Sequence, residues 1–272
     1  MNAVEVIQGS SPVILGQPHS GTFVPEEIYA QLNDVGRQLL DTDWHIPALY
    51  EGLLKNATVV RANFSRYVID ANRDPSGVSL YPGKSTTDLV PMTTFDGASI
   101  WLNKPDSDCI ARRRRDFHEV YHRSLQAEIS RLKEHHNDVL LYDCHSIRSE
   151  IPFLFDNELP VLNIGTNLGQ TCTQKISQDV EAICRSNNDY SHVINGRFKG
   201  GWTTRHYGRP ETGVHALQME LAQRAYLKTE RPPFEFDEAR ASALQSLLAD
   251  VLNSIEMNLQ TMSKTEAKPS AV

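Results

Sequence analysis

Four clusters of polar side chains in this 272-residue sequence could carry out chemistry. Each lies at the end of an apolar segment or at the start of a helical one; they cover residues 18–21, 41–45, 143–146 and 218–220. A catalytic zinc ion takes three protein ligands, often two histidines and a carboxylate, and keeps a fourth position open. His19 and His145 are the candidate imidazole ligands, and Asp43 is the best candidate carboxylate ligand.

A zinc hydrolase also needs a carboxylate that does not bind the metal and that accepts a proton from the metal-bound water. Glu220 is the best candidate for this base. The spacing of these residues is not local, unlike that of an HExxH motif. The residues alone therefore leave open that His19 and His145 are capping or core side chains.

Other reactive side chains have simpler interpretations. Cys144 precedes His145, but adjacent residues of a strand point to opposite faces, so we expect an idle thiol rather than a nucleophile. His118 and His122 have the i, i+4 spacing that could bind a metal, and a surface or packing role is favoured. There is no CxxC pair among the four cysteines, which are Cys109, Cys144, Cys172 and Cys184.

Arginines in loop-like segments suggest a small anionic substrate. Arg66 is followed by the pair Asn72–Arg73, and Arg205 and Arg209 lie in a glycine-rich stretch. Guanidinium groups suit bidentate recognition of carboxylates, although surface salt bridges are the alternative for each arginine. The basic run at residues 112–115 is surrounded by acidic residues, so we expect a solvated helix face there.

The overall composition excludes several classes of protein. The 34 acidic and 27 basic residues give a formal net charge of −7, which argues against a nucleic-acid binder. No segment approaches the roughly 20 apolar residues of a membrane span. The beginning of the sequence lacks the pattern of a signal peptide, so a cytoplasmic location is expected. No phosphate-binding glycine motif follows a strand, which argues against a nucleotide-binding protein.

The elements that must position these groups alternate along the chain. Strands are predicted at residues 12–17, 57–62, 67–70, 139–143, 162–165, 192–194 and 214–221. Helical patterns cover residues 25–40, with interruptions at residues 33–34 and 36, and residues 46–54, 106–136, 171–185 and 238–262. This alternation predicts one α/β domain with a largely parallel or mixed sheet and helices on both faces. Ligands of such sheets bind outside the carboxyl ends of the strands, where the candidate residues lie.

Several longer motifs together resemble the N-formylglutamate amidohydrolase family. They are PHSG, DTDWH, SRYVIDANRDPSG, LYPG, DCHS, NGRFKGGWTTRHYGRP and HALQMEL, between about residues 12 and 227. The resemblance implies a fold similar to zinc carboxypeptidases and aspartoacylases, with one zinc ion at the strand ends. It implies hydrolysis of N-formyl-L-glutamate to formate and L-glutamate in a route of histidine degradation.

The resemblance also implies roles for individual residues. His19 and His145 look like zinc ligands, and Asp43 most resembles the third, with Asp41 and His45 as alternatives. Glu220 looks like the general base, and Arg66 resembles an arginine that polarises the scissile carbonyl. The substrate-binding residues implied or suggested are Asn72, Arg73, Arg205 and Arg209.

We therefore expect a zinc amidohydrolase domain over residues 1–262 and a flexible tail over residues 263–272. Its expected partner is a small dicarboxylate substrate rather than nucleic acid or a membrane. Another divalent metal could occupy a His2Asp site. A deacylase of another N-acyl amino acid, a carboxypeptidase-like peptide hydrolase and a metal-free carboxylate-binding protein remain alternatives, and the oligomeric state is unknown.

Overall fold

A mixed sheet with the strand order β1-β3-β2-β4-β7-β5-β6 forms the centre of the computed structural model, which describes residues 2–78 and 87–266. Strands β3, β2, β4 and β7 run parallel, whereas β1 pairs antiparallel with β3 and β5 pairs antiparallel with β7. The strands are β1 Val4–Ile7, β2 Val13–Gln17, β3 Thr58–Ala62, β4 Val139–Ile147, β5 Leu162–Gly165, β6 His192–Ile194 and β7 Val214–Ala222.

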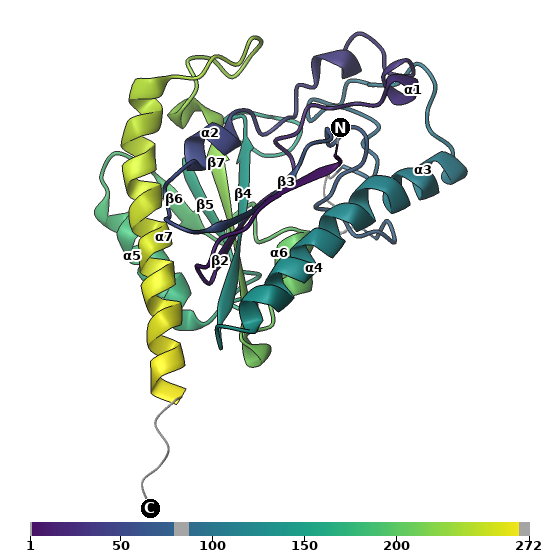
Figure 1. The fold of residues 1–272 in the computed structure, drawn as a ribbon. Coiled ribbons are helices and arrows are strands. Elements are labelled where there is room, and N and C mark those ends of the chain that lie inside the picture. Colours follow the sequence, from purple (N-terminus) through teal and green to yellow (C-terminus); the bar gives the residue numbers. More distant parts are fainter. Residues whose placement is uncertain (1, 79–86, 267–272) are drawn as a thin grey trace, which may run out of the picture.

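Helices cover both faces of this sheet, as the alternating pattern predicts (Figure 1). One face packs against α2, α5 and α7, and the other against α4 and α6. The helices are α1 Glu26–Tyr29, α2 Ile46–Tyr50, α3 Ser107–Arg113, α4 Glu119–Lys133, α5 Gln174–Ser186, α6 Trp202–Tyr207 and α7 Glu238–Glu266. The predicted α/β architecture with a mixed sheet is therefore confirmed.

Alternation along the buried central strand decides which side chains can reach the site. In β4, Leu140, Tyr142 and Cys144 belong to the core beneath α5 and α7. Leu141 belongs to the opposite core, beneath α4. Since successive side chains of a strand point to opposite faces, His145 lies on the α4 side of the sheet.

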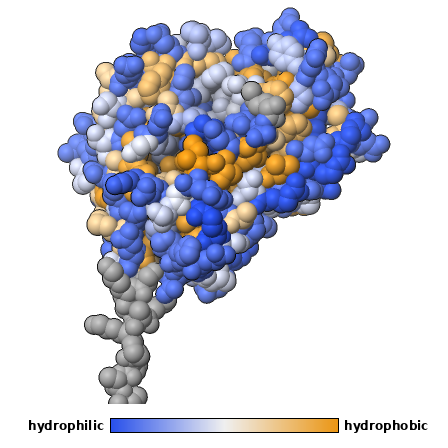
Figure 2. Space-filling model, in the orientation of Figure 1, coloured by the Kyte–Doolittle hydropathy of each residue, from blue (hydrophilic) through white to orange (hydrophobic). Residues whose placement is uncertain are grey.

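A long, slightly irregular helix crosses that side. Asp106 caps it, because its carboxylate accepts a hydrogen bond from the backbone N–H of Cys109. A π-helical turn, Arg114–His118, joins α3 to α4. Figure 2 shows hydrophilic side chains along the outer side of these helices. Arg113 departs from the expected solvated run, since it is buried with its guanidinium over the ring of Trp101.

One helical pattern is broken at its expected interruption and forms less helix than expected, and one predicted strand is wrong. Residues 25–40 form only the short α1 and a 3-10 turn, because the Asn33 side chain accepts hydrogen bonds from the N–H groups of Val35 and Gly36 and breaks the helix. Residues 67–70 form a turn rather than a strand, and the Val68 N–H bonds to the Ser65 carbonyl. A short run of apolar residues predicts a buried strand, but here the same run is buried in a loop.

The last helix is longer than predicted. α7 continues to Glu266, four residues into the segment expected to be a tail, and residues 267–272 lie outside the described part of the chain. The LYPG motif at residues 80–83 also lies outside it. Within the described ranges, the helices lack the combination of length and hydropathy that a bilayer span requires.

Candidate active site

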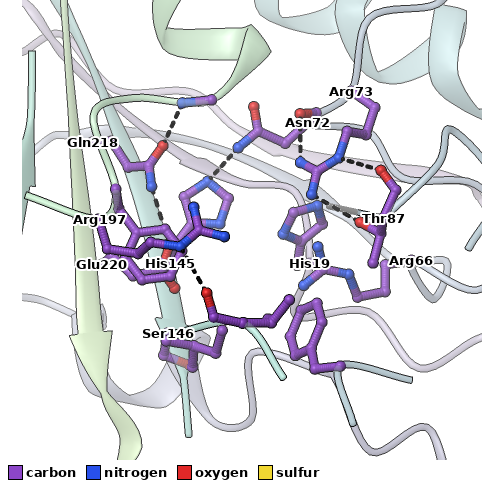
Figure 3. A pocket seen from close by; sticks show the side chains of 15 residues that line it. His19, Arg66, Asn72, Arg73, Thr87, His145, Ser146, Arg197, Gln218 and Glu220 are labelled. Carbon is purple, nitrogen blue, oxygen red and sulfur yellow. Dashed lines mark hydrogen bonds between the residues drawn. The ribbon is translucent and has the colours of Figure 1, made fainter. Parts of the chain in front are cut away.

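A buried cavity opens at the carboxyl ends of the parallel strands. It is the place where polar side chains from distant parts of the sequence meet (Figure 3). The described residues that line it are His19, Arg66, Asn72, Arg73, Thr87, Phe95, His145, Ser146, Ile147, Leu154, Arg197, Phe198, Gly201, Gln218 and Glu220. The sequence analysis proposed nine residues as metal ligands, catalytic residues or substrate-binding residues, apart from the alternatives Asp41 and His45. Six of them line this cavity, and a seventh, Asp43, contacts His19 and His145.

His19, Asp43 and His145 form a cluster that could hold a metal ion. One ligand atom from each lies within 4.8 Å of the others, and all three side chains are buried. His145 Nδ1 is 3.2 Å from Asp43 Oδ2, and His19 Nδ1 is 3.8 Å from the same oxygen. The two Nδ1 atoms and the carboxylate therefore face a common point.

The backbone brings these three residues together. His19 follows the end of β2 by two residues, and its carbonyl accepts a hydrogen bond from the Asp43 N–H. His145 stands on the neighbouring strand β4, and the Ser146 N–H donates to Asp43 Oδ2. The loop before α2 is thereby fixed against the ends of two parallel strands.

A metal ion fits this arrangement. His19 Nδ1 and Asp43 Oδ1 are buried polar atoms without a hydrogen-bond partner, which is costly unless another group satisfies them. The opposite nitrogens of both rings face carboxylates: His19 Nε2 is 2.7 Å from Asp70 Oδ1, and His145 Nε2 is 3.2 Å from Asp143 Oδ1. Such carboxylates hold a ligating imidazole in the right tautomer and orientation. Two histidines and a carboxylate suit zinc.

Burial and neighbouring charges shift the protonation of this cluster. Burial lowers the pKa of His19. Burial alone would also lower the pKa of His145, but Asp143 and Asp43 outweigh it and raise that pKa well above its usual range. The pKa of Asp70 is held well below its usual range, because His19, Arg73 and Arg66 outweigh the effect of burial.

Glu220 lies beside the cluster without belonging to it. It stands on β7 directly opposite His145 of β4 in the parallel register, and its side chain lines the cavity. Gln218 Nε2 donates a hydrogen bond to Glu220 Oε2 over 3.1 Å. Burial raises the pKa of Glu220 to about 8. A carboxyl group in this state can exchange a proton near neutral pH.

The predicted pair Asn72–Arg73 lines the opposite side of the cavity. Asn72 Nδ2 is 3.0 Å from His145 Nε2. Arg73 donates hydrogen bonds to the carbonyl and the hydroxyl of Thr87. Arg66 is more deeply buried, and it forms an ion pair of 2.8 Å with Asp70. Its guanidinium carbon lies 4.8 Å from the centre of the Phe95 ring.

Arg205 and Arg209, which were suggested for substrate binding, are not among the described residues that line the cavity. Arg205 Nε donates to the Gly200 carbonyl, and the exposed Arg209 donates to the carbonyls of Arg205 and Gly208. They lie on and after α6, whereas Arg197, earlier in the same stretch, lines the cavity. Sequence reasoning missed Arg197, although its loop-borne guanidinium gave the same signal.

The alternatives near the cluster have other partners. Asp41 accepts hydrogen bonds from the Tyr67 hydroxyl and the Phe95 N–H, and burial raises its pKa to about 6. His45 Nε2 is 2.8 Å from the Phe234 carbonyl oxygen. Cys144 is buried in the core on the other face, where burial raises the pKa of its thiol well above the usual value. Asp43 is thus the carboxylate that joins the two histidines.

A model of the N-formylglutamate amidohydrolase family matches residues 11–227 of the chain. The chain belongs to this family. Membership makes it an amidohydrolase, and it confirms the family that the motifs indicated.

Two relatives in this family are similar over nearly their whole length. The chain is 41% identical to the N-formylglutamate deformylase of Pseudomonas aeruginosa over 251 residues, which are 91% of this chain and 94% of that protein. It is also 41% identical to the N-formylglutamate deformylase of Pseudomonas putida, covering 93% of that protein.

Solved structures support the same fold. The N-formylglutamate amidohydrolase of Ralstonia eutropha JMP134 superposes with a TM-score of 0.80 at 23% identity, covering 96% of this chain and 99% of that one. A gene product of Agrobacterium tumefaciens superposes with a TM-score of 0.70 at 17% identity, covering 96% and 97%. At these identities the likeness concerns the fold.

Proposed function

We propose that this protein is a zinc-dependent N-formylglutamate deformylase, which hydrolyses N-formyl-L-glutamate to formate and L-glutamate. The observation that carries the proposal is the meeting of His19, Asp43 and His145 with Glu220 in one buried cavity that arginines also line. The names of the two Pseudomonas relatives support the choice of substrate.

The proposed zinc ligands are His19, Asp43 and His145. A zinc ion there would act as a Lewis acid and lower the pKa of its water, which makes a nucleophile available at neutral pH. Glu220 accepts a proton from the attacking water and returns it to the leaving amine nitrogen, so that an amine rather than an amide anion departs. Arg66 stabilises the negative charge that develops on the former carbonyl oxygen.

The two carboxylates of the substrate provide most of its binding energy. A formyl group is small and offers little apolar area, so discrimination must come from charged and polar contacts. Arg73 and Arg197 approach the cavity from opposite sides (Figure 3). We assign one substrate carboxylate to Arg73 and Asn72 and the other to Arg197, because a guanidinium can bind a carboxylate through two parallel hydrogen bonds.

The cellular setting follows from the proposed substrate. A free amino-acid derivative is a metabolite of the cytoplasm, and that location stays a prediction. A role in histidine degradation, which the resemblance implies, also stays a prediction.

A deacylase of another N-acyl amino acid is the main alternative. Purified protein would be incubated with N-formyl-, N-acetyl- and N-succinyl-L-glutamate and with N-formyl-L-glutamine, and release of the free amino acid would be measured. We expect kcat/KM to be highest for N-formyl-L-glutamate and about tenfold or more lower for N-formyl-L-glutamine, which lacks one carboxylate. A higher kcat/KM for the acetyl or succinyl compound would reject the proposed substrate. Zinc content would be measured on the same preparation.

A further inference from the structure

Two buried histidines of the long helix remain outside the proposed chemistry. His118 is the last residue of the π-helical turn, and His122 lies one helical turn further along in α4. Residues four apart on a helix share a face, and the centres of these two rings are 4.4 Å apart. Neither ring lines the active-site cavity. Both pack beside Trp202 of α6, with ring-centre distances of 5.6 and 4.6 Å.

The same nitrogen of each ring bonds to the backbone of one short segment. His118 Nε2 is 2.9 Å from the carbonyl oxygen of Arg73, and His122 Nε2 is 2.7 Å from that of Ala71. A carbonyl oxygen only accepts, so Nε2 carries the proton in both rings. Burial lowers the pKa of both histidines, which agrees with neutral rings that each have a single N–H.

The residue between these two carbonyls faces the active site. Asn72 Nδ2 is 3.0 Å from His145 Nε2, and Asn72 Oδ1 accepts a hydrogen bond from the Thr203 N–H. Arg73 lines the cavity beside it (Figure 3). The segment is thus held from one side by the two histidines and from the other by the beginning of α6.

Resting on the proposed function, we propose that His118 and His122 are positioning residues, which fix the segment 71–73 so that Asn72 and Arg73 present their side chains to the substrate carboxylate. Loss of either backbone bond leaves a buried carbonyl without a partner and lets the segment move. Because the residues they position, Asn72 and Arg73, are assigned to substrate binding, we expect their loss to weaken binding more than it slows the chemical step. The Tyr207 hydroxyl donates to the backbone carbonyl oxygen of His122 and lies 3.1 Å from the second ring nitrogen of His122, so it packs against that residue from the other side.

Two amide substitutions at one position separate positioning from simple packing. The terminal amide of glutamine reaches the place of Nε2, whereas that of asparagine stops near Nδ1. We expect His118→Asn to raise KM for N-formyl-L-glutamate about tenfold with kcat within about threefold of the wild type, and His118→Gln to restore KM to within about threefold. His135→Asn, an exposed position beyond the end of α4, is the control.

Hydrogen exchange of the peptide that covers residues 70–74 is measured on the same proteins and does not depend on turnover. We expect faster exchange in His118→Asn than in His118→Gln or the wild type. If His118→Asn does not fold, Tyr207→Phe takes its place, with an expected threefold or larger rise in KM and the same change in exchange. Unchanged KM and exchange in the folded variant overturn the positioning role, as do equal effects of asparagine and glutamine. An inactive wild type with the expected exchange pattern would reject the proposed substrate instead.

Discussion

His145 of β4 and Glu220 of β7 stand directly opposite each other in the parallel register of the sheet. A candidate metal ligand and a candidate base thereby lie side by side, although 75 positions separate them in the sequence. Parallel strands bring their carboxyl ends to one edge, so the base needs no mobile loop to reach the cluster. The sheet register sets their relative position, and contacts with Gln218 and Asp143 hold the two side chains.

Glu220→Gln tests the proposed base. The amide keeps the shape of the side chain but cannot take a proton from water, so we expect formate release to fall by about 10²-fold to 10⁴-fold. Zinc content should stay near that of the wild type, because Glu220 is outside the cluster. Glu211→Gln, at an exposed position, is the control. Activity within about tenfold of the wild type would reject Glu220 as the base.

A pair of substitutions in the loop before α2 tests the third ligand. Asp43→Asn should lose bound zinc and activity, because a neutral amide is a much poorer zinc ligand than a carboxylate. Asp41→Asn should retain zinc, since Asp41 bonds to Tyr67 and Phe95 instead. Elemental analysis after dialysis measures both. Retention of zinc by Asp43→Asn together with loss by Asp41→Asn would exchange their roles.

Removal of the metal tests the cofactor. After treatment with a chelator, we expect no formate release, and full activity should return with one equivalent of Zn²⁺. Circular dichroism would show that the chelated protein is still folded. Undiminished turnover in metal-free protein would reject a metal-dependent reaction, and better recovery with another divalent ion would change the assigned metal.

Substitutions of the arginines test the substrate-binding assignment. Arg73→Ala and Arg197→Ala should each raise KM by about tenfold to a hundredfold, the effect of losing a hydrogen bond to a charged group. Arg209→Ala should leave KM within about twofold, because Arg209 is exposed and away from the cavity. Steady-state kinetics with N-formyl-L-glutamate measures all three. A large effect of Arg209→Ala with none of Arg197→Ala would reverse the assignment.

Gly201→Ala tests the close packing of α6 against Asn72. An added Cβ would lie 2.3 Å from Asn72 Nδ2 and 2.6 Å from Oδ1, so the Asn72 side chain must move. We expect a loss of about 1–3 kcal/mol in the free energy of unfolding, as for other overpacked sites. Substrate affinity should also fall. Denaturant unfolding and KM are the measurements, and an unchanged value of both would show that the site has more room than the structure indicates.

The central strands and the long helix could be predicted from the sequence, because runs and repeats of apolar residues along the chain decide which side chains these elements bury. The buried strands around Leu15 and Leu141 are short apolar runs, and the helix through Leu125 has an amphipathic repeat. The apolar residues around Tyr67 predict a strand but form a turn, since distant residues such as Leu89 bury their side chains. Burial without regular hydrogen bonding leaves the same pattern in the sequence.

The sequence by itself determined the family, the α/β architecture and the residue types of the site, because motifs and apolar periodicity are properties of neighbouring residues. Only the tertiary structure shows Asp43, which the sequence already favoured, clustered with His19 and His145, and only it places Arg197 rather than Arg205 at the cavity. It also placed His118 and His122 behind Asn72. These positions depend on how irregular loops pack against the ends of strands. Such loops have no repeating hydrophobic pattern, and their contacts join residues tens of positions apart in the sequence.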